Sequence, residues 1–192
     1  MTLLQIMAAD DRDQVLLRST DGDRIGAELA AVGIRFERCE LAEVEPDADQ
    51  AAILAGYRPL VDRVSREGGY QLVDVVQLAP DDADPQWAAK ADAARQKFLS
   101  EHTHDEDEVR FFVAGEGCFY LHLGERVYAT VCAAGDLLSV PAGTTHWFDM
   151  GVRPRFATIR FFQQEDGWLA SFTGDPIAAQ FPSLDELLSR QS

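Results

Sequence analysis

The histidines of this chain, with one glutamate, have the types and spacing that suit metal chemistry. His102 and His104 are two positions apart, so on a strand both side chains point to the same face, and Glu108 keeps that parity. Two imidazoles and a carboxylate directed into one interior provide half of an octahedral or square-pyramidal site for a first-row divalent metal. His146 follows the turn residues Pro141 and Gly143, and a hairpin there can bring it across as a fourth ligand.

The alternative interpretation places His102 and His104 on the surface, within the acidic segment 101–108. A bare His-x-His pair favours that alternative, whereas the surrounding glycines and proline favour the metal site. His122, in a strand beside the turn residue Gly124, is expected to be structural or exposed and not a ligand. Arg110 continues the parity of Glu108 and should face the same interior; alternatively, it pairs with the acidic run 105–107.

The elements that must position these residues change in character near residue 100. Before it we predict mainly helices: one capped by Asp23 and closed by Gly33, one running from Pro46 to Gly68, and one capped by Asp84 and ending near Phe98. The apolar stripes are Ile25, Leu29 and Val32 in the first, Leu54, Tyr57, Val61 and Val64 in the second, and Trp87, Ala91, Ala94 and Phe98 in the third. A strand is predicted over 70–78.

Beyond residue 100 the pattern predicts short strands separated by turns. They cover 109–114, 118–123, 126–133, 137–140, 146–149 and 155–162, with Gly115-Glu116-Gly117 as the turn between the first two. We therefore expect a mainly β antiparallel sandwich or barrel with helices packed outside. The expected division is a single domain, 1–192, with a mostly helical N-terminal extension (1–69), a β-barrel core (70–165) and a C-terminal tail (166–192).

The composition excludes several classes of partner. The 192 residues include 33 acidic and 17 basic side chains, giving a formal charge of −16, which argues against nucleic acid or an anionic membrane as partner. No apolar stretch is long enough for a membrane span. Cys39, Cys118 and Cys132 show no paired spacing and predict reduced residues of a cytoplasmic protein. The sequence does not define the oligomeric state, and we expect a monomer.

Two spaced patterns resemble a known superfamily. His102-x-His104-x3-Glu108-x6-Gly115 and Gly135-x5-Pro141-x-Gly143-x2-His146 look like the two cupin motifs. Gln96 and Met150 depart from them, but neither departure falls on a ligand position. A narrower resemblance covers nearly the whole chain. Segments 33–38, 69–71, 97–113, 139–150 and 167–174 are similar, in the same order, to bacterial acireductone dioxygenase.

This resemblance implies a cupin barrel (a double-stranded β-helix, or jelly roll) with His102, His104, Glu108 and His146 holding one Fe²⁺ or Ni²⁺ per chain. It implies cleavage of 1,2-dihydroxy-3-keto-5-methylthiopentene by O₂ in methionine salvage. With iron the family forms 4-methylthio-2-oxobutanoate and formate; with nickel it forms 3-methylthiopropanoate, formate and carbon monoxide. Four protein ligands leave two octahedral positions for a bidentate enediolate, and the ligand set does not choose between the metals.

The same resemblance assigns roles around the metal. Arg110 corresponds to an arginine that holds the anionic substrate, and Phe98, Phe148 and Trp168 correspond to aromatic residues of its pocket. From the residues alone, Phe98 and Phe148 fit an ordinary core, whereas Trp168 lies beyond the last strand and suits a pocket mouth. Two alternatives stay open: another cupin dioxygenase or isomerase, which substrate screening would identify, and a non-catalytic metal-binding cupin without metal-dependent O₂ uptake.

Overall fold

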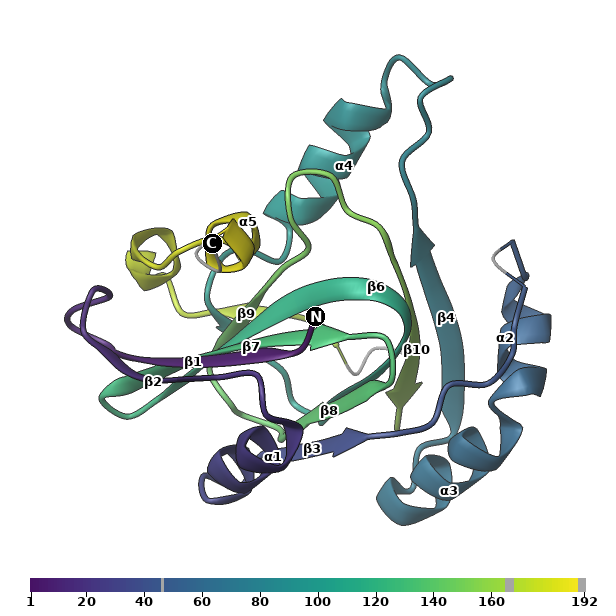
Figure 1. The fold of residues 1–192 in the computed structure, drawn as a ribbon, viewed down its shortest axis with the longest axis horizontal. Helices are drawn as coiled ribbons and strands as arrows, with labels where there is room; N and C mark the ends of the chain where they lie inside the picture. The colour runs from purple at the N-terminus through teal and green to yellow at the C-terminus, as the bar shows by residue number, and fades with distance from the viewer. Residues whose placement is uncertain (46, 165–167, 190–192) are drawn as a thin grey trace.

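The fold is mainly β with helices at its periphery, as expected (Figure 1). A computed structural model describes residues 1–45, 47–164 and 168–189. The strands are β1 (Leu3–Ala8), β2 (Val15–Ser19), β3 (Arg35–Arg38), β4 (Leu72–Leu78), β5 (His102–Thr103), β6 (Glu108–Leu123), β7 (Arg126–Ala133), β8 (Asp136–Val140), β9 (His146–Asp149), β10 (Phe156–Phe162) and β11 (Ser171–Phe172). The helices are α1 (Gly22–Ala30), α2 (Gln50–Gly56), α3 (Arg58–Gly68), α4 (Trp87–Gln96), the 3-10 helix η1 (Pro176–Gln180) and α5 (Leu184–Ser189).

The long strand β6 joins the two halves of an antiparallel sheet system. Its first half pairs with β8 and β10, and its second half pairs with β7 and β9. The turn expected at Gly115-Glu116-Gly117 is absent from the described structure, because these residues lie inside β6. Gly115 has φ +70°, and its pairing with β10 is irregular nearby, at Ala157 and Thr158. The register skips Val113 of β6, and a bulge beside a glycine with positive φ bends a strand without ending it, which explains the difference.

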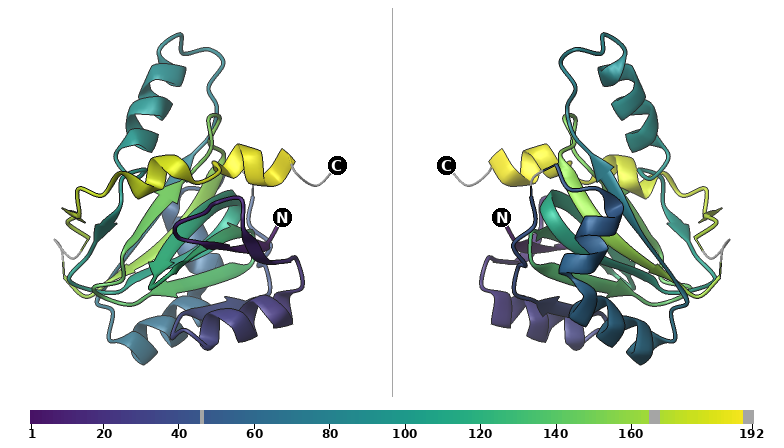
Figure 2. Two further views of the ribbon diagram at one scale, coloured as in Figure 1. Left: turned by 90° about the vertical axis from the view of Figure 1, so that its left-hand side faces the viewer. Right: turned by 90° about the vertical axis from the view of Figure 1, so that its right-hand side faces the viewer.

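Helices cover the sheets on their outer faces and at one end (Figures 1 and 2). Ile25 and Leu29 of α1 join the interior cluster that contains Phe112 and Phe148. On one outer face, α2 and α3 pack against β4, β6 and β10 through a second cluster, while η1 and α5 pack against the opposite sheet through a third.

The N-terminal segment contains strands that the sequence pattern did not indicate. Residues 1–69 were expected to be mostly helical, yet β1 pairs with both β2 and β7, and β3 pairs with β8. Every residue of β1 is buried, so it lacks the alternation of a half-exposed strand. The segment 1–69 therefore contributes to the barrel as well as carrying helices.

Three helix boundaries differ from those expected. Asp21, and not Asp23, caps α1, since its side chain accepts from the backbone N–H of Arg24. The helix expected from Pro46, which lies outside the described residues, is two helices: α2 begins after its cap Asp49, and α3 follows with a proline in its first turn. Asp84 is not the capping residue of α4: its side chain accepts from the N–H of Gln86, and α4 begins after Gln86, at Trp87.

The strands predicted over 126–133, 137–140 and 146–149 are confirmed within one residue, and those predicted from 70 and 155 within two. In the described part of the chain, no helix combines the length and apolar character needed to cross a membrane.

Candidate metal centre

Three short pieces of backbone bring four potential ligands together. His102 lies on β5, Glu108 begins β6 and His146 begins β9, while His104 lies just after β5. All four side chains are buried, and their ligand atoms lie within 4.8 Å of one another. Pairing of β5 with β9 places His102 directly opposite His146. Residues 104–107 interrupt the strand, so the shared orientation of Glu108 does not come from the single continuous strand that the parity argument assumed.

Each of the three histidines is oriented by a backbone carbonyl. The Nδ1 atoms of His102, His104 and His146 lie 2.7, 3.1 and 2.8 Å from the carbonyl oxygens of Ser100, Leu169 and Thr144, respectively. A carbonyl only accepts, so each Nδ1 carries a proton, and Nε2 is the ring nitrogen left for a metal ion. The Nε2 atoms of His104 and His146 face Glu108, at 3.0 and 3.1 Å from its Oε2. This is the arrangement by which proteins prepare imidazoles for a metal.

Glu108 is ionised despite complete burial. Burial raises the pKa of its carboxyl group, but the charge of Arg110 and hydrogen bonds from His104 and His146 outweigh this and hold the pKa well below 4.5. Burial lowers the pKa of His102 to about 4, so this imidazole is neutral near pH 7. Three imidazole nitrogens with one carboxylate form a donor set that fits iron or nickel.

Arg110 adjoins the four residues and faces inward, as expected. Its Nε donates to Oε1 of Glu108 at 2.7 Å, and its partner is therefore Glu108 and not the acidic run 105–107. The guanidinium carbon lies 4.7 Å from the ring centre of Phe148, 5.1 Å from that of Trp168 and 5.4 Å from that of Phe119. Aromatic faces stabilise a cation held in such a position.

The three predicted pocket aromatics have different surroundings. Trp168 is half-buried, stacks on His104 with ring centres 6.4 Å apart, and donates from Nε1 to the carbonyl of Asp107 at 3.1 Å. Phe148 is buried beneath Arg110. Phe98 packs against the interior cluster, and its carbonyl accepts from the N–H of Phe148. Trp168 and Phe148 thus contact the site directly, and Phe98 contacts it through Phe148.

Two aromatic residues at the site were not predicted. Phe119 contributes to the surroundings of Arg110. Phe172 places its ring edge-on to His102 with centres 5.8 Å apart, and it is 59% exposed. No sequence signal marked Phe172, because its position depends on pairing between β11 and β5.

A cavity of about 470 Å³ opens beside Trp168. Leu72, Val73, Asp74, Arg160, Phe162, Trp168 and Leu169 line it. Arg160 lies opposite Arg110 in the β6–β10 register and forms a two-pronged ion pair with Asp74. The cavity adjoins the four-residue cluster through Trp168 and Leu169, which contact His104, and its apolar lining residues suit a small ligand with an uncharged tail.

His122, the fourth histidine, lies apart from this cluster. Its Nδ1 is 2.7 Å from Oε1 of Glu101, and it is not among the four grouped residues. The expectation that it is structural agrees with these contacts.

Comparison with known proteins identifies the family. The sequence model of the ARD/ARD′ family matches residues 28–170. The chain belongs to this family. Acireductone dioxygenase 1 of Nocardia farcinica (strain IFM 10152) is 61% identical over 188 residues, covering 98% of this chain and all of the relative. Acireductone dioxygenase of Frankia alni (strain DSM 45986 / CECT 9034 / ACN14a) is 54% identical over 193 residues, covering 100% of this chain and 93% of the relative.

A solved member of the ARD/ARD′ family supports the fold. Acireductone dioxygenase from Bacillus anthracis with cadmium ion in its active center superposes with a TM-score of 0.75 and 26% identity, covering 90% of this chain and 98% of the other. The expected cupin architecture is confirmed, and the resemblance stated from the sequence motifs is confirmed with it.

Proposed function

We propose that this chain is a metal-dependent acireductone dioxygenase that uses O₂ to cleave 1,2-dihydroxy-3-keto-5-methylthiopentene in methionine salvage. The observation that carries the proposal is the buried group of His102, His104, Glu108 and His146, with Arg110 beside it. Membership of the ARD/ARD′ family and the names of its relatives support the same activity.

The four grouped residues are proposed to hold one Fe²⁺ or Ni²⁺. Their carbonyl-oriented imidazoles are ready to bind without reorganisation, and Glu108 supplies the single negative charge. A bound ion supplies Lewis-acid chemistry, which favours the deprotonated, electron-rich form of an enediol. The dissociated acireductone is anionic, and the total charge of −16 repels it, so binding depends on positive charge at the site itself.

Arg110 is proposed to hold the anionic substrate. Its Nε is engaged by Glu108, and a guanidinium has further N–H donors for a charge-assisted hydrogen bond. Phe148 and Trp168 fix the guanidinium from its sides and exclude water from the reacting atoms. Phe98 takes part by holding Phe148 through its carbonyl.

The bound ion selects the products in this family. Iron gives 4-methylthio-2-oxobutanoate and formate, and nickel gives 3-methylthiopropanoate, formate and carbon monoxide. Intrinsic affinity favours nickel over ferrous iron, so occupancy in the cell depends on metal supply.

Anaerobic reconstitution with each ion tests the activity. The metal-loaded protein is mixed with the acireductone and O₂, and the products are identified by mass spectrometry and a carbon monoxide assay. His104→Ala serves as the metal-free control. Metal-dependent cleavage is the expected result, and no cleavage with either ion would overturn the proposal.

We also propose that the chain acts as a cytoplasmic monomer. The three free cysteines are compatible with a reducing compartment, and every residue assigned to the site comes from one chain. Light scattering after size-exclusion chromatography and cell fractionation test these two points.

A further inference from the structure

The segment between His104 and Glu108 connects two potential ligands without belonging to a strand. A loop of this kind needs other contacts to keep its flanking side chains in place. Three hydrogen bonds converge on one residue of this loop, Asp107, which immediately precedes Glu108.

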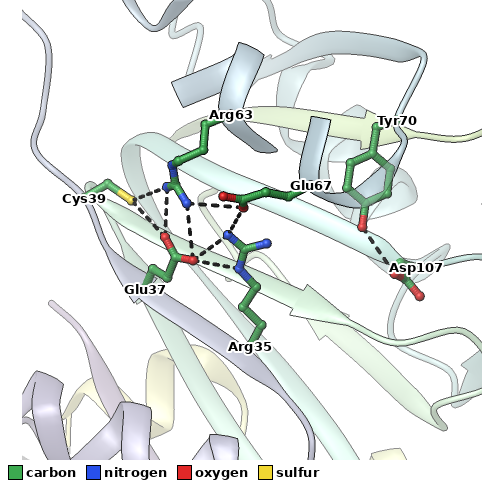
Figure 3. A network of polar contacts seen from close by, with 7 residues as sticks. All are labelled: Arg35, Glu37, Cys39, Arg63, Glu67, Tyr70 and Asp107. Carbon is green, nitrogen blue, oxygen red and sulfur yellow. Dashed lines mark hydrogen bonds and ion pairs between the residues drawn. The ribbon is translucent and has the colours of Figure 1, made fainter. Parts of the chain in front are cut away.

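Each acceptor atom of Asp107 holds a different part of the chain. Its Oδ1 accepts from the backbone N–H of Ala142 at 2.9 Å. Its Oδ2 accepts from the hydroxyl of Tyr70 at 3.2 Å (Figure 3). Its carbonyl accepts from Nε1 of Trp168 at 3.1 Å. Asp107 therefore links the loop to three segments that are distant in the sequence.

The bond to Ala142 matters because that residue lies in the turn before His146. Gly143, in the same turn, donates its N–H to the carbonyl of His104 at 2.9 Å. Two hydrogen bonds thus join the loop 104–107 to the turn, one at each end of the loop. This double attachment fixes the spacing between His104 and Glu108 on one side and His146 on the other.

Tyr70 is itself firmly placed beyond the end of α3. A Cβ on Gly68 would lie 2.0 Å from Cε2 of Tyr70, so glycine is required for the ring to pack there. Ion pairs fasten the same helix to β3: Glu67 pairs with Arg35 at 2.7 Å, and Arg63 pairs with Glu37 at 2.9 Å (Figure 3). Burial, with the charge of Asp107, raises the pKa of Tyr70 to about 12, so its hydroxyl remains a donor near pH 7.

We infer that Asp107 is a positioning residue for the metal centre. It ties the loop 104–107 to the turn at Ala142 and to Tyr70, and so keeps Glu108 aligned with His104 and His146. The inference rests on the metal centre of the proposed function. It assigns no chemical step to Asp107, whose three hydrogen bonds hold Tyr70, Ala142 and Trp168.

Metal release from the folded protein tests this role without measuring catalysis. Wild type and variants are loaded with Ni²⁺, and the dissociation rate is followed with a chromogenic chelator, well below the thermal midpoint of each apoprotein. Asp107→Ala should release the ion about tenfold faster, in keeping with other residues that support metal ligands. Asp107→Asn keeps an acceptor oxygen for Ala142 and should restore release to within about threefold of wild type. The matched control Asp105→Ala changes an exposed acid of the same loop and should release the ion at the wild-type rate.

The outcomes separate three interpretations. If Asp107→Ala has a lower apoprotein Tm but releases Ni²⁺ at the wild-type rate, Asp107 is merely structural and the inference is overturned. If Asp107→Ala does not fold, Tyr70→Phe decides: release about threefold faster supports the inference, and unchanged release overturns it. If wild type itself binds no Ni²⁺ or Fe²⁺, the proposed metal centre fails instead.

Discussion

Nε of Arg110 lies 2.7 Å from Oε1 of Glu108, and the two side chains form an ion pair that is almost fully removed from solvent. The other carboxylate oxygen, Oε2, faces the imidazoles of His104 and His146. One carboxylate thus serves three side chains, with one oxygen toward the arginine and the other toward two of the proposed metal ligands.

Replacing Glu108 with Gln is expected to impair both metal binding and stability. The amide removes the only negative charge among the four ligands, so metal content should fall below about a tenth of wild type under matched loading. The apoprotein should lose about 3 kcal/mol of unfolding free energy, because Arg110 remains buried without its counter-ion. Elemental analysis and urea denaturation measure these effects, with the exposed Glu125→Gln as control. Full metal content in Glu108→Gln would contradict the assigned ligand set.

Replacing Arg110 with Met is expected to separate substrate binding from metal binding. Methionine keeps apolar contact with Phe148 but removes the guanidinium, while a bound ion still compensates the charge of Glu108. Metal content should stay near wild type, and kcat/KM should fall about 100-fold, the scale of a lost hydrogen bond to a charged group. Steady-state kinetics on metal-quantified protein checks this. Wild-type turnover would rule out a substrate role for Arg110.

The sequence predicted which residues form the candidate site, but it did not predict what holds them in their positions. His102, His104, Glu108 and His146 were identified because histidines are few and their spacing is distinctive. The argument from strand parity nevertheless assumed a continuous strand, whereas residues 104–107 form a loop. What keeps Glu108 aligned is tertiary contact, which local spacing does not encode.

The missed elements share a physical cause. β1 is buried on both faces, so its sequence carries no alternation to mark it as a strand. β11 has two residues and exists through its pairing with β5, which brings Phe172 to His102. Such features depend on partners far along the chain, and a single sequence gives no direct information about that pairing.

Asp149 is expected to control stability in acid. Burial raises the pKa of its carboxyl group, but Arg95 and the N–H groups of Leu184 and Gly151 outweigh this and lower the pKa below 3.8. A carboxyl group whose pKa is lower in the folded than in the unfolded protein stabilises the fold at pH values above the unfolded pKa. That stabilisation is lost as the pH falls through the folded pKa. Asp149→Asn should therefore cost about 3 kcal/mol at pH 7, since it leaves Arg95 without its charge partner. The difference from wild type should shrink below pH 3.8 in denaturation curves; a difference independent of pH would refute this explanation.

Gly115 is expected to be essential for the bend in β6, and Gly124 provides a matched comparison. Both have positive φ, +70° and +61°. A Cβ at Gly115 would lie 1.8 Å from the carbonyl oxygen of Arg155, whereas a Cβ at Gly124 would meet nothing within 4 Å. Gly124→Ala should therefore cost only the backbone strain of a left-handed residue, about 1 kcal/mol. Gly115→Ala must also separate β6 from β10, so its cost in unfolding free energy should exceed about 3 kcal/mol. Because Glu108 lies on the same strand, the displacement of β6 should also speed the release of Ni²⁺. Urea denaturation and Ni²⁺ release on both variants measure this, and equal losses would show that the close backbone approach is unimportant.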